Sequence, residues 1–205
     1  MNRFVMSLMA AFAVALPGAA FAADYNIDPS HASVDFSVRH LMVTKVRGTF
    51  EKVSGKVKYD PEAPEKIEIE AIIDAASINT REAKRDEHLR SPDFFDVEKH
   101  PTLTFKSKKA KARGKGKLDV TGDLTIRGVT KEVVLAVEGL DQEIKDPWGN
   151  VRRGASATTK INRKDFGLNW NQVLEAGGLM VGDEVEIMID VELIRQAAKE
   201  ETAAK

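Results

Sequence analysis

Apolar and polar side chains alternate one by one along several stretches of this chain. The clearest stretch lies near the C-terminus, where Val185, Ile187 and Ile189 alternate with Glu184 and Glu186. Because successive side chains of a β-strand point to opposite faces, this period of two predicts a strand with one buried and one solvated face. The same alternation predicts about eight strands in all, over residues 34–39, 52–59, 67–73, 102–106, 118–126, 132–138, 155–161 and 184–193.

The connections between these stretches are short and carry turn signals such as Asp60-Pro61 and Arg127-Gly128. Short connections favour antiparallel hairpins, since a parallel pair needs a crossover of about a dozen or more residues. One longer interval, residues 79–100, contains a run of helix-forming residues and predicts one short helix near residues 81–90. The apolar strand faces must pack against a second sheet or line a barrel, and periodicity alone does not choose between the two.

The first 22 residues have the order of a secretory signal peptide. Arg3 precedes a long apolar stretch, and the small residues Ala20 and Ala22 stand where a signal peptidase cuts. We expect cleavage after Ala22, one mature domain over residues 23–195 and a C-terminal tail over residues 196–205. The alternative is an uncleaved membrane anchor, which needs about 20 apolar residues and no small-residue exit. No later stretch is apolar for long enough to span a bilayer, so the processed chain is expected to be soluble.

The composition narrows the chemistry that the chain can perform. It has 205 residues and no cysteine, which excludes disulfides, cysteine-ligated iron–sulfur clusters and thiol catalysis. Its formal net charge of −1 gives no reason to expect a nucleic-acid partner. The four histidines, His31, His40, His88 and His100, lack the spacing of zinc sites, so we expect no metal and no cofactor. There is no Gly-x-Ser-x-Gly motif either, although catalytic groups can assemble from distant positions.

Several motifs in fixed order carry a family resemblance. They are Val46-Arg47-Gly48-Thr49-Phe50, Ser77-Ile78-Asn79-Thr80, Asp93-Phe94-Phe95-Asp96, the segment 122–131 and Arg163-Lys164-Asp165-Phe166-Gly167-Leu168. Together they resemble the YceI-like family of bacterial secreted proteins, also called the polyisoprenoid-binding or lipocalin-like periplasmic family. The resemblance covers about residues 25–194. One departure is Met42, at a position where relatives often have glycine, so the loop at the barrel mouth is expected to differ.

The resemblance implies a fold, a location and a ligand class. The fold is a mainly β, extended, antiparallel eight-stranded lipocalin-like barrel with one short helix covering an end. The location is the periplasm. The ligand is a long-chain amphiphile in an apolar lumen, such as a polyisoprenoid, a prenyl diphosphate, an isoprenoid quinone or a fatty molecule.

The interior of such a barrel is either filled by its own side chains or able to hold one small ligand. Small residues at the inward positions Ala71, Ala155, Ala157 and Gly122 argue for room, whereas the alternative is a solid core. Together with the resemblance they favour a cavity. We expect it to be lined by Phe36, Val38, Phe50, Ile69, Ala71, Phe94, Phe95, Leu103, Phe105, Leu124, Ile126 and Phe166. Since Phe94 and Phe95 are adjacent, one is expected to plug the barrel end and the other to face the ligand or the helix.

Four residues are candidates for contact with a diphosphate or quinone head group. They are Arg47, Arg81, Arg85 and His40, because guanidinium groups match phosphate oxygens. Taken alone, each such residue is more often an ordinary surface charge or a structural partner than a ligand contact.

The leading hypothesis is non-enzymatic binding, carriage or storage of the amphiphile. One alternative is an enzyme that acts on it, with His88 or His40 as acid or base. Another is a stress-protective interaction protein whose barrel is only a scaffold.

The surface of the domain offers two possible contacts, one with a membrane and one with a second copy of the chain. Lysines along the hairpin at residues 106–117 are typical of a solvated sheet edge, and the alternative is transient docking on an anionic membrane. An exposed strand edge or the tail offers a way to form a homodimer.

Overall fold

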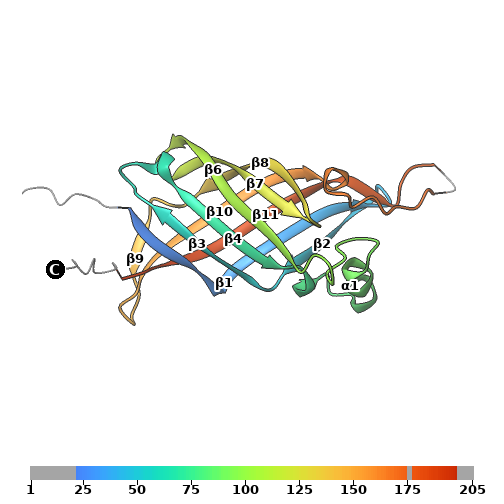
Figure 1. Ribbon diagram of the computed structural model, residues 1–205, viewed down its shortest axis with the longest axis horizontal. Coiled ribbons are helices and arrows are strands. Elements are labelled where there is room, and N and C mark those ends of the chain that lie inside the picture. Colours follow the sequence, from blue (N-terminus) through green and yellow to red (C-terminus); the bar gives the residue numbers. More distant parts are fainter. Residues whose placement is uncertain (1–21, 175–176, 198–205) are drawn as a thin grey trace, which may run out of the picture.

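A closed barrel of antiparallel strands is the central feature of the computed structural model, which describes residues 22–174 and 177–197 (Figure 1). The ring follows the order β1, β3, β4, β6, β7, β8, β10, β11, and pairing of β11 with β1 closes it. This confirms the eight-stranded barrel and excludes two separate sheets. The strands of the ring are β1 (Ala23–His40), β3 (Val53–Tyr59), β4 (Glu68–Asp74), β6 (Thr102–Gly114), β7 (Lys117–Ile126), β8 (Val129–Glu138), β10 (Val151–Asn162) and β11 (Val181–Arg195).

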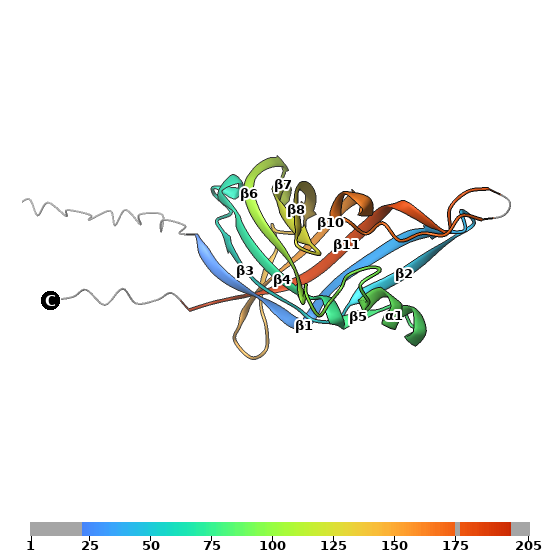
Figure 2. The ribbon, with the colours of Figure 1, turned by 45° about the vertical axis from the view of Figure 1, so that its right-hand side comes forward.

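Two of these strands are long enough to extend beyond the ring. The first residues of β1 pair with β3, whereas its second half pairs with β2 (Thr44–Phe50). A register shift between Ile27 and Ala32 lies between these two halves. Strands β1, β2 and β11 therefore form a narrow sheet that projects from one end of the barrel (Figure 2).

The short helix α1 (Ala83–Arg90) lies at the same end of the barrel (Figures 1 and 2). It begins two residues later than the start of the predicted range, because Arg81 has a φ of 64° and Glu82 is an extended N-cap. The other short elements are η1 (Pro64–Lys66), η2 (Ala75–Ser77), β5 (Ile78–Asn79), β9 (Glu143–Lys145) and η3 (Arg163–Phe166). Within residues 22–174 and 177–197, no helix is long and apolar enough to span a bilayer. The predicted signal peptide, apart from Ala22, and most of the predicted tail lie outside the described residues.

Strand β2 was not predicted from the sequence, and the reason is local. Its inward positions are Val46, Gly48 and Phe50, so a glycine interrupts the apolar alternation. A Cβ atom at position 48 would lie 2.5 Å from Cζ of Phe36, which is far inside van der Waals contact. The glycine is needed for an aromatic ring of the neighbouring strand, and this need is invisible in the local pattern.

The end of the barrel opposite α1 is closed by a polar plug. Arg153 is only 5% exposed, and its guanidinium donates to the carbonyl oxygen of Leu140 and to the Glu143 carboxylate. The guanidinium carbon also lies 5.2 Å from the ring centroid of Tyr59 and 5.8 Å from that of Tyr25. Burial raises the pKa of Tyr59. The interior is therefore sealed at this end by buried side chains.

The wall of the barrel is incomplete between β8 and β10. These strands share only the register pairs from Ser156↔Glu138 to Thr158↔Ala136. Beyond them the 3₁₀ turn η3 contacts both strands, and its Phe166 is 1% exposed. The turn thus covers the place where the two strands separate.

Candidate functional site

A cavity of about 570 Å³ occupies the barrel interior and continues along the inner face of the projecting sheet. Its wall includes β11 residues from Val181 to Leu193, and twelve steps of about 3.3 Å per residue make it roughly 40 Å long. Small-molecule sites typically measure about 300–1,000 Å³. The cavity is therefore long and narrow, and it is large enough for one ligand with an extended chain.

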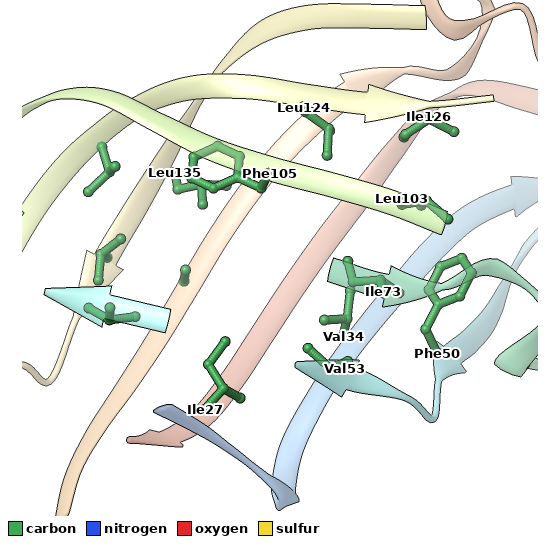
Figure 3. Packing of buried hydrophobic residues seen from close by; sticks show 14 of the residues in the cluster. Ile27, Val34, Phe50, Val53, Ile73, Leu103, Phe105, Leu124, Ile126 and Leu135 are labelled. Carbon is green, nitrogen blue, oxygen red and sulfur yellow. The ribbon is translucent and has the colours of Figure 1, made fainter. Parts of the chain in front are cut away.

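The wall is built mainly from apolar side chains that point inward from the barrel strands. Figure 3 shows side chains of β1, β3, β4, β6 and β7 converging on this interior. Eleven of the twelve residues predicted to line a lumen do so: Phe36, Val38, Phe50, Ile69, Ala71, Phe94, Phe95, Leu103, Phe105, Leu124 and Ile126. Whether they contact a ligand stays a prediction.

The twelfth residue, Phe166, does not line the cavity. It is the buried last residue of η3, and it borders a separate shallow depression together with Arg127 and Trp170. Its prediction as a lumen residue was wrong because it fills the gap between β8 and β10, and that gap depends on pairing between distant strands.

The small inward residues differ in what they leave room for. Ala71, Ala155 and Ala157 lie on the cavity wall, as expected. Gly122 does not, because the ring of Phe105 lies against it, and a Cβ there would stand 2.5 Å from Cζ of that ring. The missing side chain at Gly122 makes space for a neighbouring aromatic residue and not for a ligand.

Aromatic rings line the cavity near α1. Phe50 lies between Phe36 and Phe95, with ring centroids 5.8 Å and 5.6 Å away. Phe94 and Phe95 both contribute to the wall but have different neighbours: Phe94 packs against His88 of α1, and Phe95 packs against Phe50. They lie in an irregular turn after α1, where Asp96 has a φ of 49°, and neighbouring side chains there need not point to opposite faces.

The predicted head-group residues are not brought together. Arg85 and His40 lie on the cavity wall, and Arg47 and Arg81 do not. Arg47 occupies an outward position of β2 opposite Ser37, and Arg81 lies in the exposed turn before α1. The sequence did not show that strand pairing turns Arg47 away from the interior.

Arg85 is held in place by its own chain neighbours. Its Nε atom donates to Oγ1 of Thr80 at 2.8 Å, and its Nη2 atom donates to the Thr80 carbonyl oxygen at 2.9 Å. The Asp86 carboxylate accepts from the backbone N–H and the hydroxyl of the same threonine, at 2.8 and 2.5 Å. Thr80 therefore fixes the guanidinium at the cavity wall.

Further polar residues line the cavity near α1, among them Glu82, Lys84, His88 and Trp170. Of these, only His88 was considered from the sequence, and only as a possible acid or base. Lys84 and His88 are four residues apart and share one face of α1, which is the signal that would have found them. His88 lies 2.8 Å from the Asp93 carboxylate, and its ring meets those of Phe94 and Trp170 edge-on, with centroids 5.1 and 4.8 Å apart. The cavity thus has basic groups near the helix.

A cluster of possible metal ligands lies on another part of the barrel. Ligand atoms of Asp28, His31 and Glu192 lie within 4.8 Å of one another. The guanidinium of Arg152 donates to two of these residues, to Asp28 at 2.7 Å and to Glu192 at 2.8 Å. It also donates to Asp146 at 2.7 Å. These bonds hold the pKa of Asp28 well below its usual range and lower the pKa of Asp146 to about 2. The cluster is an ion-pair network, and we assign no metal to it.

The lysine-rich hairpin lies on the outer wall of the barrel. Its turn, between β6 and β7, is at the end opposite α1 (Figure 1). Several of its charges are compensated across neighbouring strands: Lys106 by Glu70, Lys108 by Asp123 and Glu132, Arg113 by Asp119, and Lys117 by Glu138. Such pairs are typical of a solvated outer wall, and membrane contact by this hairpin stays a prediction.

Comparison with known proteins adds a family to this geometry. A family model described as a YceI-like domain matches residues 25–193. A UPF0312 protein of Ectopseudomonas mendocina is 42% identical over 181 residues, which cover 87% of this chain and 91% of the relative. A UPF0312 protein of Vibrio cholerae is 40% identical over 170 residues, covering 82% of this chain and 89% of the relative.

Solved structures show the same fold. The crystal structure of a Campylobacter jejuni YceI protein is 30% identical, with a TM-score of 0.63 over 78% of this chain and 90% of that chain. BcnA of Burkholderia cenocepacia has a TM-score of 0.69 at 24% identity, over 81% of this chain and 98% of its own. A polyisoprenoid-binding domain from Saccharophagus degradans has a TM-score of 0.61 at 18% identity, over 84% and 98% of the two chains. At these lower identities the likeness is one of fold.

Proposed function

Because this chain belongs to the YceI-like family and its barrel encloses a long apolar cavity, we propose that it binds a long-chain amphiphile without transforming it chemically. The ligand class is a polyisoprenoid, a prenyl diphosphate, an isoprenoid quinone or a similar molecule. The single observation that carries the proposal is the cavity of about 570 Å³, whose strand walls are apolar from Leu193 to Val181. The described polyisoprenoid-binding domain of Saccharophagus degradans has the same fold, which agrees with this ligand class.

The hydrophobic effect alone can supply the affinity. Burying one methylene group stabilises a complex by about 0.8 kcal/mol, so a chain of ~20 carbons offers ~16 kcal/mol. Association costs about 4–15 kcal/mol in lost freedom. An apolar wall therefore suffices for binding.

The polar groups of the wall suggest how the ligand is oriented. Lys84, Arg85 and His88 lie beside the cavity at α1, whereas the opposite end is sealed by the buried Arg153 plug. The head group would lie near α1, with the chain directed toward Leu140 and Leu193. Two cations and an imidazole outnumber the one carboxylate on this stretch of wall, that of Glu82, and favour an anionic or hydrogen-bond-accepting head.

The place of action is part of the same proposal. The order of Arg3, an apolar stretch and Ala20 and Ala22 supports export and cleavage after Ala22. Export followed by binding of a lipid makes this a periplasmic carrier or store.

The test uses one residue on the wall and its neighbour on the outer face. Ala157 is 8% exposed and lines the cavity, while Thr158 is exposed on the opposite face of β10. We expect native mass spectrometry of the protein purified from a bacterial host to show a bound lipid of defined mass. Ala157→Phe places a large ring in the narrow cavity and should abolish this lipid, and Thr158→Phe should retain it. A wild-type protein that remains empty after exposure to a total lipid extract would contradict the proposal.

One observation favours a second candidate, an enzyme acting on the same amphiphile. His88 lies on the cavity wall within hydrogen-bond distance of Asp93, which is the geometry of a general base and its orienting carboxylate. Turnover of a supplied prenyl diphosphate that is lost in His88→Ala would establish catalysis. Binding of the same compound with no product would leave carriage as the function.

A further inference from the structure

Four large apolar side chains are exposed together at the free end of the projecting sheet. Leu41, Met42 and Val43 in the β1–β2 turn are 37%, 59% and 77% exposed, and Val173 in the segment before β11 is 80% exposed. The two segments adjoin each other, because the Leu41 N–H donates to the carbonyl oxygen of Met180 at 2.8 Å. Figures 1 and 2 show both at one extremity of the molecule. We call these four side chains the apolar tip.

The backbone of the tip is unfavourable for the residues that it carries. Leu41 and Met42 have φ angles of 52° and 60°, and the turn closes with a bond from the Val43 N–H to the His40 carbonyl oxygen. Left-handed positions favour glycine, asparagine or aspartate. A turn that only reversed the chain would be more stable with those residues. Strained positions occupied by large side chains are found where the side chains have a role.

The tip is continuous with the cavity. His40, which precedes Leu41, lies on the cavity wall. Met180, whose carbonyl oxygen accepts from the Leu41 N–H, and the next residue, Val181, also lie on this wall. Apolar surface therefore extends from the barrel interior along the sheet to its exposed end. A ligand that leaves the cavity along this wall arrives at the tip.

Charges beside the tip complement an anionic surface. Arg39 on β1 and Arg47 on β2 are exposed within a few residues of the turn. The neighbouring carboxylates of β11 are paired with lysines: Asp183 with Lys164, Glu184 with Lys160, and Glu186 with Lys45 and Lys160. The two arginines thus contribute positive charge close to the apolar residues.

We propose that the apolar tip inserts into the interfacial layer of a phospholipid bilayer and holds the cavity mouth against the acyl chains. The inference rests on the proposed function, because a bilayer is the source and destination of such a ligand. An apolar chain then moves between bilayer and cavity along Met180 and Val181 without crossing water, which is costly for apolar surface. Exposed apolar patches rimmed by cations are typical of membrane contact.

The chain offers a matched control at its other end. Ile144 and Trp148 on the β9–β10 hairpin are 63% and 81% exposed, so they present comparable apolar surface. They lie at the end that Arg153 seals. A contact that depends only on exposed hydrophobicity would use them as readily as the tip, whereas the proposal does not.

The first experiment measures flotation of the signal-free protein with vesicles of phosphatidylethanolamine and phosphatidylglycerol. In Met42→Asn/Val43→Ser the asparagine adopts the left-handed conformation readily, so the turn is retained. We expect the vesicle-bound fraction of this variant to be about tenfold lower than that of the wild type, because two apolar side chains are no longer buried in lipid. Ile144→Ser/Trp148→Ser should bind like the wild type. Equal losses in both variants, or loss only in Lys111→Gln/Lys115→Gln on the lysine-rich hairpin, would overturn the proposal.

A second measurement reports insertion directly. The chain has no cysteine, so Val43→Cys carries the sole thiol and accepts one environment-sensitive dye. Its emission should shift to the blue on adding vesicles, and Trp148→Cys with the same dye should not shift. An unshifted dye at position 43 would overturn the proposal.

The ligand content separates this inference from the function on which it rests. Native mass spectrometry of the same samples shows whether lipid is bound. A wild type that holds lipid but does not float with vesicles contradicts the tip alone. A wild type that floats but never holds lipid contradicts the proposed function.

Discussion

At the scale of single residues, two glycines decide where aromatic rings can lie. Gly48 accommodates the ring of Phe36, and Gly122 accommodates that of Phe105. Both rings belong to residues of the cavity wall, so the shape of the cavity depends on the lack of a side chain at Gly48 and at Gly122. Neither glycine has a positive φ, and the requirement is therefore one of space and not of backbone freedom.

Gly122→Ala should destabilise the protein by about 1–3 kcal/mol, as overpacking of a filled interior typically does. The added Cβ would lie 2.5 Å from the Lys106 carbonyl oxygen as well as from the Phe105 ring, and a backbone atom cannot move aside cheaply. Urea denaturation measures the change. The control is Gly154→Ala on β10, where nothing lies within 4 Å of a new Cβ, and its free energy of unfolding should be unchanged or slightly higher. Equal effects at the two positions would contradict this account.

At the scale of elements, one carboxylate organises the β9–β10 hairpin. The Asp146 side chain accepts hydrogen bonds from the backbone N–H groups of Trp148 and Asn150, from the Asn150 amide and from Arg152. Arg152 also binds Asp28 on β1, so the hairpin is fastened to the barrel. The bond from Arg152 is the main cause of the lowered pKa of Asp146.

This network predicts acid sensitivity with a definite sign. The pKa of Asp146 is about 2 in the folded protein, whereas the ordinary value for an aspartate, expected in the unfolded chain, is 3.8. Folding therefore favours the ionised form. Its stabilising contribution is present above about pH 4 and is lost as the pH falls toward 2, and Asp28 acts in the same direction. Thermal unfolding between pH 2 and pH 7 should show a shallower pH dependence in Arg152→Gln, which is also less stable at pH 7. Lys160→Gln, which breaks an exposed pair, should keep the wild-type slope.

At the scale of the whole molecule, the cavity exists because the wall of the barrel is closed. Closure of β11 on β1 and the plug around Arg153 enclose an apolar volume of about 570 Å³ that side chains leave unfilled. An unfilled apolar interior loses contact energy that a ligand restores. Stability and occupancy should therefore be coupled.

Removing the ligand should lower the melting temperature. At a ligand concentration about 100 times Kd, binding stabilises the folded state by about 2.7 kcal/mol. For a domain of 150–250 residues this corresponds to roughly 5–10 °C. Calorimetry of delipidated and reloaded protein checks the shift, and Ala157→Phe should show none. A reloaded wild type with the melting temperature of the delipidated sample would argue that the cavity is not a binding site.

Much of the architecture was predictable from local sequence. The alternation in β11 and its counterparts identified the eight strands of the ring, and the helix-forming run located α1. Eight of the predicted wall residues lie on these strands and face the cavity for the same reason, since period two assigns each side chain to a face. Predictions failed where a contact joins distant segments. Phe166 fills a gap between two strands, Gly122 makes space for Phe105, and Arg47 is turned outward by its pairing with β1.

The amino-acid sequence by itself determined which side chains share a strand face, where the chain turns and which groups are available for chemistry, because these depend on neighbours within a few residues. Only the tertiary structure decided that the sheet closes, that the inward side chains leave a cavity, and that Arg85, Lys84 and His88 meet it while Arg81 does not. Closure and volume depend on register between strands such as β1 and β11, which stand at opposite ends of the domain. A sum of local preferences does not contain that register.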